Sequence, residues 1–305
     1  MKQTLGFVLL SLYGSANGFV QQPSLQRHSL PKTSVFSYLD SLSVNSYTST
    51  APWPTDVSEP SQSAFYYAPK SFFSLDNLTS KGARTTADVG TPAEGTRKLV
   101  QIGNTRAGSW SCTAGGWPSP NPKAHTEVFY VWDGHGSLTD SDGVVHYFGP
   151  GDTVIIPKGH TGRWVVLADM HKLWFVHEHD NVEESKPIRV RVIHYQELVC
   201  KENLVNYGVS KDAVRGNPTI YSSVLYNAGA NNVGGWMCTP GCFNIHGLDT
   251  TIGFYVLEGL FYITDAETGQ CSRCGPGDTV MLPEGWSGSV DVVETAKKLW
   301  TNLYK

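Results

Sequence analysis

The histidines of this chain are concentrated in one region. Eight of the ten lie between His125 and His194, so side chains that titrate near neutral pH gather in this stretch. His125 is two residues before Glu127, and residues two apart on an extended strand point to the same face. An imidazole and a carboxylate that share a face can bind a divalent metal ion or transfer protons. The region around Glu127 is therefore the first candidate site.

An internal repeat positions these residues. Five segments recur at a spacing of 125 or 126 residues, which indicates two copies of one domain. The pairs are Gly108–Gly115 with Gly234–Gly241, Phe129–Val131 with Phe254–Val256, Leu138–Asp140 with Ile263–Asp265, Gly149–Val154 with Gly275–Val280, and Lys172–Trp174 with Lys298–Trp300. We predict that domain 1 spans residues 63–182 and that domain 2, which is degenerate, spans residues 183–305.

Each copy has the pattern of short strands. Val128–Trp132, Thr153–Ile156 and Trp164–Leu167 are rich in β-branched and aromatic residues and lie between turn signals, whereas helix patterns are nearly absent. The turn signals are Pro150-Gly151, Pro276-Gly277, Asp142-Gly143 and Thr268-Gly269. The pattern predicts an all-β sandwich or barrel. Asp152 recurs as Asp278 in a matching turn, so we expect it to cap that turn rather than act as a catalytic acid.

The order of motifs in each copy resembles the cupin superfamily, and more narrowly the cupins grouped with the ethanolamine-utilisation protein Q and with ureidoglycine aminohydrolase. The motifs are Gly-x-Trp, Glu127 with six residues before Gly134, a Thr-Asp hairpin, Gly-Pro-Gly-Asp, Pro-x-Gly-x-x-Gly and a terminal Lys-Leu-Trp. They cover roughly Gly108–Phe175 and Gly234–Trp300. The resemblance implies two tandem jelly-roll β-barrels and, in metal-binding members, three histidines and one glutamate in the barrel mouth.

The resemblance carries over to domain 1 only in part. Glu127 stands where the metal-binding glutamate would be, but no His-x-His pair precedes it, and Gly162 occupies the place of the second motif's histidine. A site for Mn, Fe or Zn would then consist of His125, Glu127 and His160, completed by water or by His171. The alternative is that Glu127 is hydrogen-bonded inside the barrel and the histidines lie on loops.

Domain 2 lacks these groups. Ile252 matches Glu127 and Trp286 matches His160, so we expect no metal site of this kind there. Domain 2 is interpreted as a stabilising or partner-binding barrel.

Other residue patterns leave alternatives open. The cysteine spacings Cys238-x3-Cys242 and Cys271-x2-Cys274 resemble zinc pairs, but a disulfide or ordinary thiols are the alternatives. The stretch 177–180, His-Glu-His-Asp, is expected to be a solvated strand end rather than a surface metal site. Six aromatic residues of domain 1 either line a ligand cavity or fill the core, and Tyr130 and Trp132 share a face opposite to Glu127. The six are Trp110, Trp117, Tyr130, Trp132, Tyr147 and Trp164.

The N-terminal region has the pattern of a targeting presequence. A basic start, an apolar run and small residues at Ser15–Gly18 predict a signal peptide over residues 1–18. Residues 21–39 carry Arg27 and Lys32 and no acidic residue, and residues 41–62 are rich in Ser, Thr and Pro, which predicts a transit peptide and a linker over residues 19–62. The join resembles the bipartite presequence for secondary plastids. The alternative is secretion, with Asn77 as a glycosylation acceptor.

Three function classes remain. The formal net charge of −4 argues against a nucleic-acid partner, and no apolar run reaches the length of a membrane span. The first class is a bicupin that binds a small molecule or a protein partner without catalysis. The second is a metal-dependent hydrolase, isomerase or lyase acting on a small amide, amino acid or carboxylate, with His171 moving protons. The third is a structural subunit of a plastid assembly, and a homodimer through sheet edges is compatible with each class.

Overall fold

The computed structural model describes residues 65–180, 186–228 and 231–304. Within them the chain forms two antiparallel sheets, of nine and ten strands, as the all-β prediction required. The predicted signal peptide, transit peptide and most of the linker lie outside the described residues. No helix of the described part is long and apolar enough to cross a membrane.

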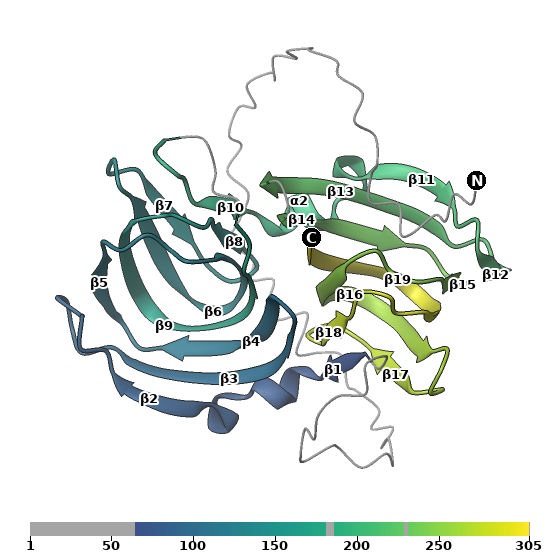
Figure 1. Ribbon diagram of the computed structural model, residues 1–305, viewed down its shortest axis with the longest axis horizontal. Coiled ribbons are helices and arrows are strands. Elements are labelled where there is room, and N and C mark those ends of the chain that lie inside the picture. The colour runs from purple at the N-terminus through teal and green to yellow at the C-terminus, as the bar shows by residue number, and fades with distance from the viewer. Residues whose placement is uncertain (1–64, 181–185, 229–230, 305) are drawn as a thin grey trace, which may run out of the picture. The chain divides into compact units, whose positions relative to one another are not determined.

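The first sheet, called barrel 1, contains nine strands and curls around its own core (Figure 1, blue to teal). They are β2 (Thr79–Ala83), β3 (Ala93–Ile102), β4 (Thr105–Cys112), β5 (Gly115–Ser119), β6 (Thr126–Asp140), β7 (Val145–Phe148), β8 (Thr153–Ile156), β9 (Gly162–His177) and β10 (Arg191–Ile193).

The second sheet, called barrel 2, contains ten strands (Figure 1, mostly green to yellow). They are β1 (Tyr66–Ala68), β11 (Val205–Val209), β12 (Ala213–Gly216), β13 (Thr219–Ala228), β14 (Asn231–Cys238), β15 (Gly241–Ile245), β16 (Thr251–Asp265), β17 (Cys271–Cys274), β18 (Thr279–Leu282) and β19 (Gly288–Leu303). The short helix α2 (Tyr195–Val199) precedes β11.

The two sheets have the same strand order, which confirms the internal repeat. The order is β10-β8-β6-β9-β4-β3-β2 in barrel 1 and β1-β18-β16-β19-β14-β13-β11 in barrel 2. The matching end strands are exchanged between the copies. Strand β1 precedes barrel 1 in the sequence but pairs with β18 of barrel 2, and β10, which leads into barrel 2, pairs with β8 of barrel 1 (Figure 1). Each copy is therefore completed by the strand that leads into the other.

The longest strand pair of each barrel bends at a glycine, and the two glycines occupy matching positions in the two copies. Gly134 in β6 has a φ of +80°, and a β-carbon there would lie 2.2 Å from the carbonyl oxygen of Asp169. Gly259 in β16 has a φ of +83° and would meet the carbonyl oxygen of Thr295 at the same distance. A side chain would not fit at such a close approach, which explains why a glycine stands at the bend of the long strand in both copies.

The predicted turn residues have their predicted role. Asp152 Oδ2 accepts a hydrogen bond of 2.9 Å from the Gly149 amide, and Asp278 Oδ2 accepts one of the same length from the Gly275 amide. Asp278 also accepts a bond from the hydroxyl of Tyr67 at the exchanged strand β1. The recurring aspartate therefore caps a turn in both copies.

Alternate residues of β9 serve two cores. Trp164, Val166 and Met170 pack inside barrel 1. Leu173 and Phe175 belong to a second core that both sheets supply. Because neighbours on a strand point to opposite faces, the side chains of Lys172 and His171 also lie on opposite faces of this wall.

Candidate functional site

Glu127 is held by two lysine ammonium groups. Its Oε1 accepts a hydrogen bond of 2.7 Å from Lys172 Nζ, and its Oε2 accepts one from Lys123 Nζ. The side chains of Glu127 and Lys172 are 13% and 5% exposed. Burial by itself would raise the pKa of Glu127, but the charges and hydrogen bonds of Lys123 and Lys172 hold it far below its ordinary value. Glu127 is thus an ionised carboxylate with both oxygens bonded to ammonium groups.

Aromatic rings surround the Lys172 ammonium group. Its nitrogen lies 3.8 Å from the ring centroid of Phe129, 4.7 Å from that of Trp164 and 4.8 Å from that of Trp110. Trp164 in turn stacks on Trp117 and on Phe129, with centroids 5.9 and 5.6 Å apart. These rings fill the core of barrel 1, as one of the two interpretations of the aromatic residues predicted.

The predicted ligand His160 bonds to a different carboxylate. Its Nε2 lies 3.0 Å from Asp140 Oδ1, and both residues are buried. In barrel 2 the matching pair is Trp286 and Asp265, in which the indole N–H donates to Oδ2 over 2.8 Å. An indole nitrogen can only donate, so the conserved task of this position is to donate to the hairpin aspartate. Burial lowers the pKa of His160, which favours the neutral ring.

His171, the predicted proton carrier, lies on the other side of the barrel wall from Glu127. Its Nε2 is 2.8 Å from Ser109 Oγ, and its ring lies nearly perpendicular to the Trp132 ring with centroids 4.7 Å apart. Burial lowers the pKa of His171 to about 4. Tyr130 and Trp132 pack in the core shared by both sheets, so the prediction that they face away from Glu127 is confirmed.

The residues present do not fit a divalent metal ion. In the part of the chain that the structure describes, no three His, Cys, Asp or Glu side chains lie close enough together to hold one. Half-buried His125, Glu127 and buried His160 are not brought together, because Glu127 is bonded to lysines and His160 to Asp140. The other interpretation holds for Glu127, which is hydrogen-bonded in the barrel, and for His125 and His160, which lie on loops, but not for His171, which lies in β9.

Barrel 2 keeps the lysine but not the carboxylate. Lys298 Nζ lies 4.3 Å from the ring centroid of Trp236 and 4.1 Å from that of Phe254. The strand register puts Ile252 where barrel 1 has Glu127. Lys298 is 5% exposed, and burial lowers its pKa to about 7.

Sequence reasoning missed these two lysines. Lys172 and Lys298 were recognised only as part of the recurring Lys-Leu-Trp. The signal that could have identified them is a charged residue at the same position of an otherwise apolar strand in both copies. A buried ammonium group loses its hydration, so a lysine at the same inward-facing position of both barrels indicates groups inside each barrel that stabilise its charge.

His177 differs from its expectation, whereas the cysteines agree with the alternative of ordinary thiols. His177, expected to be solvated, is fully buried at the end of β9, with Nδ1 3.2 Å from Thr105 Oγ1 and Nε2 2.8 Å from Thr301 Oγ1. That expectation was wrong because β9 continues to this residue and pairs on both sides. All six cysteines are free, with Cys271 exposed and Cys274 buried on the same strand.

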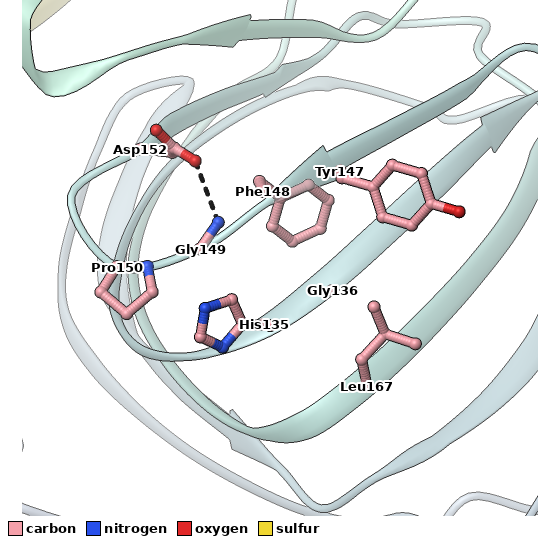
Figure 2. A pocket seen from close by; sticks show the side chains of 8 residues that line it. All are labelled: His135, Gly136, Tyr147, Phe148, Gly149, Pro150, Asp152 and Leu167. Carbon is pink, nitrogen blue, oxygen red and sulfur yellow. Dashed lines mark hydrogen bonds between the residues drawn. The ribbon is translucent and has the colours of Figure 1, made fainter. Parts of the chain in front are cut away.

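A surface pocket of about 350 Å³ lies on barrel 1. Figure 2 shows the rings of His135, Tyr147 and Phe148 and the side chain of Leu167 around it, with the turn that Asp152 caps on one side. Tyr147 and Leu167 are 68% and 54% exposed. Tyr147 is thus the one residue of the predicted aromatic set that lines this pocket.

Comparison with known proteins agrees with this architecture. A sequence model of the EutQ-like cupin domain matches residues 100–174 and 225–300. The chain belongs to the cupin superfamily. It is a bicupin, since each barrel carries one match. No curated protein sequence matches it.

Solved structures share the fold at low sequence identity. A protein of unknown function from Pseudomonas syringae pv. tomato is 15% identical with a TM-score of 0.60, and the match covers 79% of this chain and all of that one. Protein Ylba from Escherichia coli is 11% identical with a TM-score of 0.54 and coverages of 82% and 94%. A cupin 2 conserved barrel domain protein from Leptotrichia buccalis is 13% identical with a TM-score of 0.50 and coverages of 69% and 88%. At such identities the likeness concerns the fold alone.

Proposed function

We propose that this bicupin is a metal-independent binding protein whose barrel 1 takes a small organic molecule. The observation that carries the proposal is the state of Glu127, whose two oxygens each accept a hydrogen bond from a lysine ammonium group. The two ammonium groups already balance the negative charge of this carboxylate, and their positive charges repel a metal ion beside it. Chemistry that depends on a metal at Glu127 therefore has no support in this arrangement.

The pocket on barrel 1 is the binding site that we assign to this function. Its volume of about 350 Å³ is at the lower end of the range for ligand pockets. His135 and the Tyr147 hydroxyl offer hydrogen bonds, and Leu167, Phe148 and Pro150 offer apolar surface. A small metabolite that combines an apolar body with one or two polar groups suits such a lining.

Comparison of the two copies supports this choice of pocket. The residues that shape the turn recur, because Pro150 and Asp152 match Pro276 and Asp278. The two lining residues that we expect to form hydrogen bonds with a ligand, His135 and Tyr147, do not recur. His135 matches Leu260 and Tyr147 matches Arg273. Barrel 1 thus keeps the shared scaffold but differs from barrel 2 at the pocket lining.

The test combines metal analysis with a ligand screen. Purified protein, prepared without chelators, is expected to contain no stoichiometric metal, and a thermal-shift screen of small metabolites is expected to find a stabilising compound. The compound's effect should disappear in His135→Leu and Tyr147→Arg, which introduce the residues of barrel 2 at exposed positions. Stoichiometric metal in the wild type that is lost in Glu127→Gln would overturn the proposal, as would a ligand that is indifferent to both pocket variants.

We also propose that the N-terminal region directs the protein to a secondary plastid. Support comes from the order of a signal-like segment and a basic segment in residues 1–62. A fluorescent protein fused to residues 1–62 is expected in the plastid of an alga with secondary plastids, and one fused to residues 1–18 is expected to stop in the secretory pathway. Secretion of the longer fusion would contradict the proposal.

A further inference from the structure

We propose that the interior of barrel 1 is a binding site for a primary alkylammonium ion, which the chain fills with its own Lys172. The inference rests on the metal-independence proposed above and adds the chemical class that the barrel interior recognises. It concerns the core around Glu127, which is distinct from the surface pocket lined by His135 and Tyr147.

The surroundings of Lys172 Nζ have the two features that recognise an ammonium ion. The first is a carboxylate, Glu127, at 2.7 Å, which is a charge-assisted hydrogen bond. The second is the set of ring faces of Phe129, Trp164 and Trp110, with centroids 3.8 to 4.8 Å away. Ring faces attract a cation electrostatically, and more strongly in a desolvated site.

The geometry favours a primary ammonium ion over other cations. A metal ion would need several oxygen, nitrogen or sulfur ligands at about 2.0–2.6 Å, whereas carbon rings supply most of the contacts here. A quaternary ammonium ion has no N–H to donate to Glu127. A primary one donates to the carboxylate and presents its other side to the rings.

Barrel 2 shows which part of the site is particular to barrel 1. Trp236 and Phe254 repeat the rings of Trp110 and Phe129 around Lys298. Ile252 replaces the carboxylate, and Val290 replaces the third ring, that of Trp164. The complete combination of one carboxylate and three rings is therefore a feature of barrel 1.

Truncation of Lys172 tests the proposal with a matched probe. Lys172→Ala removes three methylene groups and the ammonium group, and n-propylammonium supplies three carbons and an ammonium group. We expect n-propylammonium to raise the Tm of this variant in a saturable way at constant ionic strength. Equimolar 1-propanol, which fills the same volume without charge, is expected to raise it much less.

Three controls assign the effect to the proposed contacts. In the double variant Glu127→Gln with Lys172→Ala, the advantage of n-propylammonium over 1-propanol should vanish. In Lys172→Met, whose side chain fills the space, neither compound should act, and the wild type should not respond either. An equal response to the two compounds, no response of Lys172→Ala, or a preference of that variant for a divalent metal would overturn the proposal.

A measurement on the wild-type protein keeps the proposal falsifiable if Lys172→Ala does not fold. The ammonium protons of Lys172 should exchange slowly enough to be seen by nitrogen-15 NMR at neutral pH, and its ε-methylene protons should be shifted upfield by the three rings. Both signals should change in Glu127→Gln. Rapid exchange together with unshifted ε-methylene protons would refute the site, while metal content separately decides the proposed function.

Discussion

Replacing Glu127 by glutamine should destabilise the protein more than any change at the surface. The substitution keeps the shape of the side chain but leaves Lys172, which is 5% exposed at its side chain, without its carboxylate. Removal of one partner of a buried ion pair costs about 3–5 kcal/mol, because the other charge stays buried. For a chain of this size we expect Tm to fall by about 6–20 °C, at about 2–4 °C per kcal/mol.

The companion change at Lys172 should cost less. In Lys172→Met the carboxylate of Glu127 keeps its bond to Lys123, whose side chain is 23% exposed and reaches water. We expect a loss of about 1–3 kcal/mol. The double variant, with glutamine and methionine, removes both buried charges at once, so the sum of the single losses should exceed the loss of the double variant by about 2–3 kcal/mol.

Urea unfolding at pH 7 measures this cycle. Tryptophan fluorescence, to which Trp110 and Trp164 beside Lys172 contribute, and circular dichroism both follow the unfolding. The reasoning would be refuted if Glu127→Gln unfolded within about 0.5 kcal/mol of the wild type, or if the two single losses simply added.

Three further predictions concern buried groups elsewhere. Burial lowers the pKa of Lys298 from 10.5 to about 7. The lysine therefore destabilises the fold most below pH 7, and this destabilisation decreases as the pH rises to 10.5. Lys298→Met should stabilise the protein by about 3 kcal/mol more at pH 6.5 than at pH 9.5, as thermal or urea unfolding would show. Burial lowers the pKa of His177 to about 3. Between this pH and about 6.5 the imidazole is protonated in the unfolded chain but neutral in the folded one. Stability should therefore fall as the pH drops below about 6.5, by about 2 kcal/mol at pH 5. His177→Gln should remove about 2 kcal/mol of the loss at pH 5 and leave the share of His171, whose pKa burial lowers to about 4. An unchanged profile would show that other groups cause the acid sensitivity. His160→Ala should cost about 1–3 kcal/mol because buried Asp140 loses a donor, without changing the metal content; a loss of bound metal in this variant would instead mark His160 as a ligand.

Much of the fold could be predicted from local patterns. The recurrence of whole segments, and not of single residues, indicated two copies, and turn glycines and prolines between apolar runs indicated strands. The strand lengths could not be predicted in this way. Strand β6 extends through polar residues such as Asp133 and His135, and β9 through Asp169 and His171, because bulges and the close approach at Gly134 keep the pairing intact.

The sequence located Glu127 but not the residues that bond to it. Glu127 was identified from its spacing to Gly134, and it does point into barrel 1 beside Phe129 and Lys172. Its partners could not be predicted, because Lys172 is 45 residues away in the sequence and reaches Glu127 only when β6 and β9 pair. The contact of His160 with Asp140 could not be predicted for the same reason, since the two residues lie across a hairpin.

The sequence by itself determined the duplication, the strand-rich class and the absence in domain 2 of the carboxylate found in domain 1. These are properties of residue type and spacing, which need no knowledge of what lies across the sheet. Only the tertiary structure decided that the carboxylate is satisfied by lysines, that β1 and β10 are exchanged between the barrels, and that His177 is buried. Each of these depends on which distant strands become neighbours, and burial and charge pairing acquire their energies only after that pairing is made.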